Sequence, residues 1–208
     1  MARRGVRQRI AAISVVTVLG LGVPAVAAAP ASAASAASAT AAADVDYATW
    51  KREVGTVINQ ALPYVQQRTA NASGQKLAIV FDIDNTTLET YFHPWYQIPT
   101  PAVQASLDLA KYADSRGVDI FFVTARPGII AGITKSNLTS VGYPVDGLYV
   151  RDLPDLIAEV GAYKTAKRAE IEGKGYTIIA NVGNNTTDLV GGHAERTFKL
   201  PDYDGELS

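Results

Sequence analysis

Apolar runs alternate with helical patterns along the chain after position 75. Four runs cover residues 76–83, 118–125, 148–151 and 177–183, and a shorter one covers residues 197–200. Segments such as LAIVF, IFFVTA and TIIANV are apolar at successive positions, which is typical of parallel strands with helices on both faces. Three stretches between the runs are long enough for crossover helices: 101–116, 129–141 and 163–174. This alternation predicts an α/β fold on an open, doubly wound parallel sheet with right-handed connections.

A helical pattern precedes this region. Tyr47, Trp50, Val54, Ile58 and Leu62 recur at intervals of three and four residues, which predicts an amphipathic helix over residues 46–61. The proline that follows at position 63 either kinks this helix or opens a second short turn. An Asn-Ala-Ser-Gly sequence then breaks the pattern at residues 71–74. We therefore expect an N-terminal helical segment at 44–74 and a core domain at 75–208.

The first 43 residues have a different composition from the rest. Four arginines within positions 3–9 precede an apolar stretch at about 10–26, and a run rich in Ala, Ser and Pro follows. This order is the plan of a secretory signal peptide. Gly20, Gly22 and Pro24 interrupt the apolar stretch and make it a poor permanent membrane span. We expect cleavage within residues 31–43 and a secreted or extracytoplasmic product without a stable membrane span. A retained N-terminal anchor is the alternative.

Charge and the lack of cysteine exclude several classes of function. The formal net charge is −1, and residues 1–43 carry four arginines and no acid, so the remainder carries −5. A mildly acidic protein without a basic stripe is a poor candidate for binding a nucleic acid polymer. The absence of cysteine excludes disulfide bonds, thiolate catalysis and cysteine metal sites. Composition leaves the oligomeric state open.

Polar side chains suited to catalysis follow the ends of the predicted strands. In open α/β sheets a ligand binds outside the carboxyl ends of the strands, so side chains at these positions converge on one site. They are Asp82 and Asp84 after the first strand, Thr124 and Arg126 after the second, Arg151 after the third, and Asn184 and Asp188 after the fourth. Lys164 opens a predicted helix on the same side.

Asp82 and Asp84 allow more than one interpretation. A calcium-binding loop begins in the same way, but Thr87 stands where that loop needs glycine and His93 where it needs glutamate. A solvated turn needs only one acid. Phosphoryl transfer uses the whole set, because one carboxylate can attack phosphorus while the other protonates the leaving oxygen. A divalent cation such as Mg²⁺ would bridge the two anions, and the hydroxyl and ammonium at the same edge would stabilise the transferring group.

Four strings carry a resemblance to a known family. FDIDNTTLET, FFVTARP, YKTAKR and NVGNNTTDL, in this order, resemble the four motifs of the haloacid dehalogenase (HAD) superfamily, and within it secreted acid phosphatases of the class B type (subfamily IIIB). The resemblance spans residues 76–208 and implies a doubly wound sheet in strand order 5-4-1-2-3 with at most a small cap. It implies that Asp82 is the nucleophile, Asp84 the general acid and base, Thr124 a phosphate ligand and Lys164 the lysine of the third motif.

The resemblance also implies a magnesium site. Mg²⁺ would bind the Asp82 carboxylate and the Asp84 backbone carbonyl, with help from Asn184 and Asp188 in the fourth motif. One position departs from the family pattern, because this motif commonly begins Gly-Asp and here begins Gly-Asn. An amide oxygen can bind Mg²⁺ but carries no charge, so affinity should fall. Three outcomes stay open: Asp188 takes over through a water, the protein works at high Mg²⁺, or catalysis is lost.

The expected function is therefore that of a secreted, Mg²⁺-dependent phosphomonoesterase acting on a small phosphomonoester through an aspartyl-phosphate. We expect Arg126, Thr124 and Lys164 to contact the substrate. Two alternatives remain, a catalytically weak or silent relative with a binding or storage role and a phosphotransferase on the same core. The loop at residues 89–96 contains several aromatic side chains, which either form a lid that stacks on a leaving group or pack onto the N-terminal helix.

Overall fold

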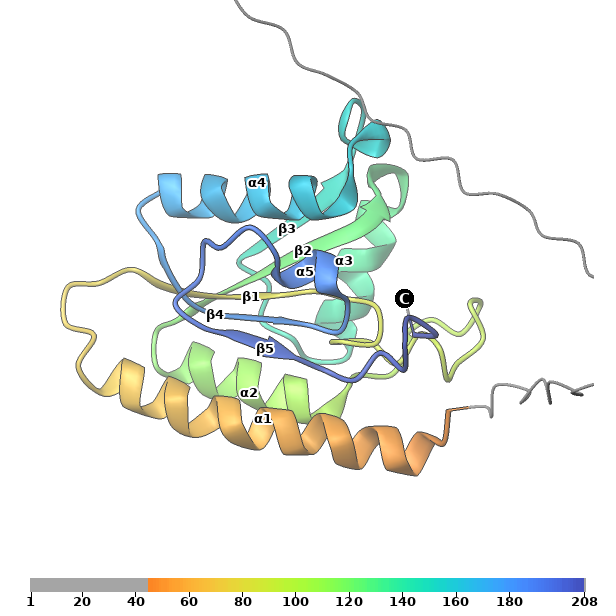
Figure 1. Ribbon diagram of the computed structural model, residues 1–208, viewed down its shortest axis with the longest axis horizontal. Coiled ribbons are helices and arrows are strands. Elements are labelled where there is room, and N and C mark those ends of the chain that lie inside the picture. The colour runs from red at the N-terminus through yellow and green to blue at the C-terminus, as the bar shows by residue number, and fades with distance from the viewer. Residues whose placement is uncertain (1–44, 208) are drawn as a thin grey trace, which may run out of the picture. The chain divides into compact units, whose positions relative to one another are not determined.

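A computed structural model of the protein describes residues 45–207. The predicted signal and processing segment, residues 1–43, lies outside the described residues. A five-stranded sheet with parallel neighbours forms the centre of the fold (Figure 1). Its strands are β1 (Leu77–Phe81), β2 (Asp119–Pro127), β3 (Gly147–Arg151), β4 (Thr177–Gly183) and β5 (Thr197–Lys199). The order β3-β2-β1-β4-β5 confirms the predicted arrangement and the predicted fold class.

Helices cover both faces of this sheet. In Figure 1, α1 (Tyr47–Ala70) and α2 (Gln104–Ser115) lie against one face, and α4 (Val160–Gly173) lies against the other. The remaining helical elements are α3 (Ala131–Ser140), the short α5 (Thr186–Leu189) and two 3₁₀ turns, η1 (Gly128–Ile130) and η2 (Asp155–Ile157). None of the helices within residues 45–207 has both the length and the apolar character that crossing a membrane requires.

The side chains of β1 alternate between two hydrophobic clusters. Leu77, Ile79 and Phe81 join the cluster that includes α1 and α2, whereas Ala78 and Val80 join the cluster that includes α4. Every residue of β1 is buried as a result. This is the physical reason for its uninterrupted apolar sequence, because a strand covered on both faces has no solvent side for polar residues.

Helix α1 is longer than the sequence pattern predicts. The prediction ended it at residue 61, but the helix continues through Pro63 to Ala70. Its buried stripe passes through Ala61 and continues beyond the proline at Val65 and Thr69, so packing against the sheet holds the second half in place. Pro63 itself is exposed. The carbonyl that loses its partner there lies on the solvent side, where water can satisfy it.

Other boundaries shift by a few residues, and one shift matters for the site. Helix α4 begins at Val160, where the Glu159 carboxylate accepts hydrogen bonds from the N–H groups of Gly161 and Ala162 at 2.9 and 2.6 Å. The prediction began this helix at residue 163, so Lys164 lies in its second turn and does not open it. The short helix α5 has no apolar repeat and was not predicted from sequence.

Candidate active site

The turn after β1 places two acids at the carboxyl edge of the sheet. Asp82 stays in the sheet register, because its N–H donates to the Val182 carbonyl at 2.9 Å. The chain then turns: the Thr87 N–H donates to the Ile83 carbonyl at 2.9 Å, and the Thr87 hydroxyl donates to the Asp82 carbonyl at 3.2 Å. Asn85 has a φ of 55°, in the left-handed region that asparagine tolerates. The hydroxyl and amide residues after Asp84 therefore satisfy the backbone of a tight, buried turn.

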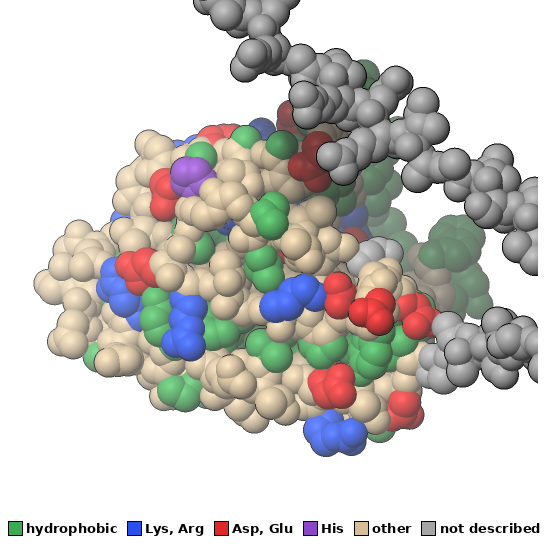
Figure 2. All heavy atoms as spheres, viewed as in Figure 1, with side chains coloured by type: hydrophobic (Ala, Val, Ile, Leu, Met, Phe, Trp, Pro, Cys, Tyr) green, Lys and Arg blue, Asp and Glu red, His purple; other side chains and the backbone are tan. Residues whose placement is uncertain are grey.

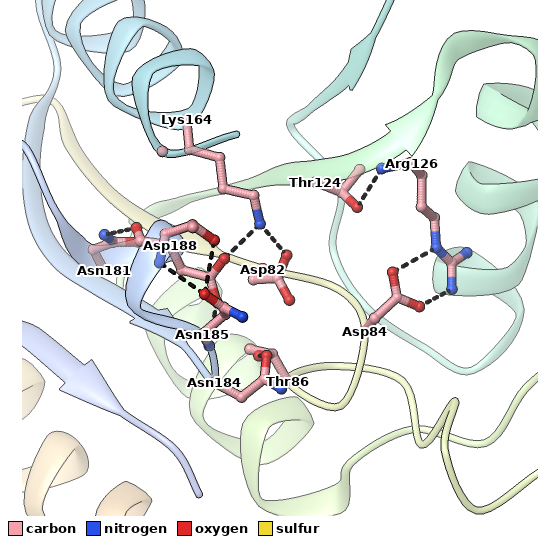
Figure 3. Close-up of polar contacts among 12 residues, drawn as sticks. Asp82, Asp84, Thr86, Thr124, Arg126, Lys164, Asn181, Asn184, Asn185 and Asp188 are labelled. Atoms are coloured by element: carbon pink, nitrogen blue, oxygen red, sulfur yellow. Dashed lines mark hydrogen bonds and ion pairs between the residues drawn. The ribbon is translucent and has the colours of Figure 1, made fainter. Parts of the chain in front are cut away.

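Lys164 links two carboxylates at the bottom of a cleft of about 530 Å³. Its Nζ donates to Asp82 Oδ1 at 2.5 Å and to Asp188 Oδ1 at 2.6 Å, as Figure 3 shows. All three side chains are at most 8% exposed. The second oxygen of Asp82 points away from the ammonium (Figure 3). The structure thus brings together three of the predicted site residues, each from a different motif.

Burial and charge oppose each other in this cluster. Burial is the largest influence on Asp82 and raises its pKa to about 7, against the opposing effect of the Lys164 ammonium. Asp188 and Asp84 add to this rise. Burial disfavours the charge on Lys164, but Asp82 and Asp188 outweigh it, so that the pKa of the ammonium is raised above its usual value. Lys164 therefore stays charged, and Asp82 reaches its ionised form only toward neutral pH when no cation is bound.

Asp84 lines the same cleft but is turned toward Arg126. The guanidinium donates to both carboxylate oxygens of Asp84, at 3.1 Å from Nε and 2.7 Å from Nη2. In Figure 3 this pair lies apart from the Lys164 cluster. The Asp84 side chain is 42% exposed, whereas Thr124 is fully buried and accepts a hydrogen bond from the Arg126 N–H at 3.2 Å. Arg126, predicted to contact substrate, thus holds the predicted general acid.

Asn184 lies in the wall of the cleft, and both ends of its amide have partners. Its Oδ1 accepts from the Thr86 hydroxyl at 3.1 Å, and its Nδ2 donates to the Leu207 carbonyl at 2.9 Å. Asp188 uses its second oxygen to accept from the Asn185 N–H at 2.8 Å, which caps helix α5. Both fourth-motif side chains are buried.

Other residues shape the site without having been predicted to take part in it. The fully buried Arg168 donates to the main-chain carbonyls of Asp188, Val190 and Gly192 and so fixes the loop after α5. Thr86 belongs to the first motif, but nothing in its position indicated a contact with Asn184. The involvement of Leu207 has no sequence signal, because it depends on how the end of the described chain folds back.

The aromatic residues of the loop at 89–96 divide between the two predicted roles, packing onto the N-terminal helix and lining the cleft. Phe92 packs onto helix α1, with ring centroids 4.6 Å from Trp50 and 4.9 Å from Tyr47. Tyr91, the preceding residue, lines the cleft. Trp95 is 90% exposed and lies outside the cleft lining. Only one aromatic side chain of this loop is therefore placed to contact a leaving group.

The carboxylate and amide oxygens that line the cleft are suitable ligands for a hard divalent cation such as Mg²⁺, bound with low affinity. Mg²⁺ accepts one or two protein carboxylates and keeps several waters or phosphate oxygens. Asp82 and Asp188 supply carboxylates, and Asn184 supplies an amide oxygen in the same cleft. Within residues 45–207, no cluster of three or more acidic or histidine side chains is arranged as a metal site. The set fits a cation shared with a phosphate, and does not fit a metal centre enclosed by protein alone.

The five-stranded sheet carries the acids and the lysine of the four motifs at its carboxyl edge, as the resemblance implied. The family described as HAD superfamily, subfamily IIIB (Acid phosphatase), matches residues 7–99 and 89–206. The chain belongs to this subfamily, which confirms the family predicted from the four motifs.

Curated relatives include both enzymes and proteins named for other properties. Stem 28 kDa glycoprotein of Glycine max is 29% identical over 174 residues, which is 73% of this chain and 67% of the relative. Acid phosphatase 1 of Solanum lycopersicum is 27% identical over 172 residues, again 73% and 67%. Vegetative storage protein 1 of Arabidopsis thaliana is 29% identical over 103 residues, 49% of this chain and 38% of the relative. The chain spans 59% to 67% of the length of the first two stem glycoproteins.

Solved structures show the same fold. The class C acid phosphatase from Bacillus anthracis superimposes with a TM-score of 0.62 at 21% identity, covering 76% of this chain and 80% of the other. The tungstate-bound form of that enzyme gives a TM-score of 0.61 at 20% identity, with the same coverage of both chains. At these identities the likeness concerns the fold alone.

Proposed function

We propose that the protein is a secreted, Mg²⁺-dependent phosphomonoesterase that works through a phosphorylated Asp82. The observation that carries this proposal is the buried cluster of Asp82, Lys164 and Asp188, which opens into a cleft at the carboxyl edge of the sheet. A cleft of about 530 Å³ suits a small phosphomonoester. The same proposal includes the domain organisation. Residues 1–43 are a signal segment that is removed, residues 44–74 form a helical segment, and residues 75–208 form the phosphatase core.

Asp82 acts as the nucleophile. Its free carboxylate oxygen attacks phosphorus, and the bond from phosphorus to the leaving oxygen breaks. Water then attacks the aspartyl-phosphate and releases inorganic phosphate, which restores the Asp82 carboxylate. Lys164 keeps its charge through both steps, holds the nucleophile in place at 2.5 Å and neutralises part of the phosphoryl charge.

Asp84 handles the proton in both steps. It protonates the leaving oxygen first and later takes a proton from the attacking water. For this role Asp84 must turn from Arg126 toward the leaving oxygen, since a carboxylate bound at both oxygens by a guanidinium has no proton to give. The guanidinium released in this way then binds a phosphate oxygen, and the Thr124 hydroxyl at the end of β2 provides a further donor.

A divalent cation would supply charge neutralisation between the carboxylate and the phosphate, and it would lower the pKa of Asp82 from its raised value. The residues that would hold it are Asp82, the Asp84 backbone carbonyl, Asn184 and Asp188. Among the three side chains in this set, only Asn184 is neutral, which is why we expect weak affinity for the cation.

A binding or storage role without efficient catalysis is the second candidate. Two observations favour it: the amide at Asn184, and the names of relatives such as vegetative storage protein 1. The retained Asp82, Asp84 and Lys164 favour the enzyme.

The decisive experiment is hydrolysis of p-nitrophenyl phosphate by a chain beginning at Asp44, with and without Mg²⁺. Asp82→Asn should abolish turnover and covalent phosphorylation, because an amide cannot act as this nucleophile. Asp84→Asn should slow both half-reactions but leave some phosphorylation with this substrate, whose leaving group needs no proton. Asp114→Asn, an exposed acid on α2, is the matched control. Wild-type activity in Asp82→Asn would contradict the mechanism, and an inactive parent would favour the storage role.

A further inference from the structure

A segment outside the four motifs forms part of the cleft wall. Residues 201–207 follow β5 and lie beside the loop between β1 and α2 (Figure 1), where Glu206 and Leu207 line the cleft together with Asp82. Leu207 is 1% exposed and belongs to the same hydrophobic cluster as α1 and α2. The N–H groups of Gly205 and Leu207 each donate to the Asp202 carbonyl at 3.1 Å, which holds the segment in a compact turn.

Two buried amides clamp this segment at one atom. The Leu207 carbonyl accepts a hydrogen bond from Asn85 Nδ2 at 2.8 Å and another from Asn184 Nδ2 at 2.9 Å. The first amide follows the predicted general acid directly, and the second follows Gly183 in the fourth motif. The chain segment that closes one side of the cleft is thus fastened to two of the motifs that build the site.

Only an amide can make both of the contacts seen at each clamp position. Asn85 Oδ1 accepts from the Tyr91 N–H at 2.8 Å, and Asn184 Oδ1 accepts from the Thr86 hydroxyl at 3.1 Å, while each Nδ2 donates to Leu207. An aspartate would keep the accepted hydrogen bond. Its second oxygen would face the carbonyl of Leu207 at hydrogen-bond distance with no proton between them, which is repulsive. The amide at the fourth motif therefore has a structural use.

The clamped segment brings negative charge to the cleft. Figure 2 shows acidic side chains on the face of the molecule where the segment lies, and the segment itself contains Asp202, Asp204 and Glu206. Glu206 lines the cleft and its Oε1 accepts from the Tyr91 hydroxyl at 3.0 Å. Among the described residues that line the cleft, four are acids (Asp82, Asp84, Asp188 and Glu206) and Lys164 is the only base, a formal charge of −3.

We propose that residues 201–207 form a specificity wall: Asn85 and Asn184 clamp it, and Glu206 disfavours phosphomonoesters whose leaving group is anionic. The reactive phosphate is compensated by Lys164 and by a cation, but a second negative charge on the leaving group meets the carboxylate of Glu206 at the cleft wall. Neutral and cationic leaving groups are favoured for the same reason. The selectivity part of this inference rests on the proposed phosphomonoesterase function, whereas the clamp does not.

Substrate selectivity tests the role of Glu206. Phosphocholine and 3-phosphoglycerate serve as probes with a cationic and an anionic leaving group. Glu206→Gln should lower the ratio of their kcat/KM values, phosphocholine over 3-phosphoglycerate, by about fivefold, the size expected for one charge at an exposed position. Asp204→Asn removes a charge from the same segment outside the cleft lining and should leave the ratio unchanged. An equal ratio in Glu206→Gln and the parent would overturn the selectivity.

Two further measurements separate this proposal from the proposed function. Dissociation constants of the two probes, measured by calorimetry, should show the same change of ratio even if the parent hydrolyses neither. Hydrogen exchange tests the clamp: in Asn85→Asp the amides of Gly205 and Leu207 should exchange about tenfold faster or more, because the segment opens locally. Asp204→Asn should keep the parent rates. Unchanged exchange in Asn85→Asp would show that the amides do not hold the wall.

Discussion

Lys164→Met tests whether the ammonium holds two buried carboxylates together, because methionine keeps much of the side-chain volume and removes the charge. In the parent, Lys164 Nζ lies 2.5 Å from Asp82 Oδ1 and 2.6 Å from Asp188 Oδ1. Removing one partner of a buried ion pair costs about 3–5 kcal/mol, since the other charge is left uncompensated. Protonation of Asp82, whose pKa is already raised to about 7, offsets part of this cost. We expect a loss of about 3 kcal/mol in the free energy of unfolding above neutral pH, with a chelator present.

The loss should depend on pH in a definite direction. Because the folded-state pKa of Asp82 is raised above the unfolded value of 3.8, its contribution to stability is present at low pH and is lost as pH rises toward about 7. Removing the ammonium raises this pKa further, because Lys164 acts to lower it. The difference between Lys164→Met and the parent should therefore be small near about pH 5 and largest above about pH 7.5.

Urea and thermal unfolding measure the effect through the fluorescence of Trp50, which is fully buried. For a domain of this size, about 3 kcal/mol corresponds to a decrease in Tm of about 6–12 °C. Added Mg²⁺ should recover part of the loss, since a cation can compensate the two carboxylates. Lys167→Met, on the same helix with a side chain 25% exposed, is the control and should change Tm by no more than about 2 °C. Equal stability of Lys164→Met and the parent, or a larger loss at low pH than at high pH, would refute the reasoning.

Three other substitutions give independent tests. Asn184→Asp gives up the hydrogen bond to the Leu207 carbonyl and adds a charge to the cleft that contains Asp82. It should lower the Mg²⁺ concentration for half-maximal activity about tenfold, because a carboxylate attracts the cation more strongly than an amide, and an unchanged midpoint would place this side chain away from the cation. Arg126→Ala should raise KM for all phosphomonoesters, because the guanidinium that Asp84 releases binds a phosphate oxygen, whereas a fall in kcat confined to substrates with poor leaving groups would show that Arg126 positions Asp84 instead. Arg168→Met leaves three main-chain carbonyls without their donor and should cost about 3 kcal/mol in urea unfolding; a loss below about 1 kcal/mol would show that water replaces the guanidinium.

The strands follow from local sequence with little ambiguity, and their order was expected from the family resemblance. Runs such as Thr177–Gly183 are apolar at successive positions because both faces of the sheet are covered, whereas a strand with one face in solvent would alternate apolar and polar residues. Helix α1 is an element whose end could not be predicted from the local sequence pattern. The sequence pattern ended the helix at residue 61, with a kink or a second short turn at Pro63, but the buried stripe through Val65 and Thr69 makes continued packing more favourable than ending the helix.

For the candidate site too, some features could be predicted from the sequence and others could not. That Asp82, Lys164 and Asp188 lie together was predictable, because strand ends of a parallel sheet share one edge and the helix that carries Lys164 was expected to begin on the same side. Their hydrogen bonds were not predictable, and neither was the pairing of Asp84 with Arg126, since the direction of a side chain depends on neighbours distant in sequence. The roles of these residues in catalysis stay predictions.

The sequence by itself determined the fold class and the family, because these depend on the order of apolar runs and of four short motifs along the chain, and the strand order was expected from the family resemblance. Only the tertiary structure decided what Asn184 does with its amide, since the partner is the carbonyl of Leu207, which follows 23 residues later and carries no motif. The physical reason is general to such contacts. A hydrogen bond between a side chain and a distant backbone carbonyl leaves no periodic trace in either segment, so only the folded chain brings the two atoms within 2.9 Å.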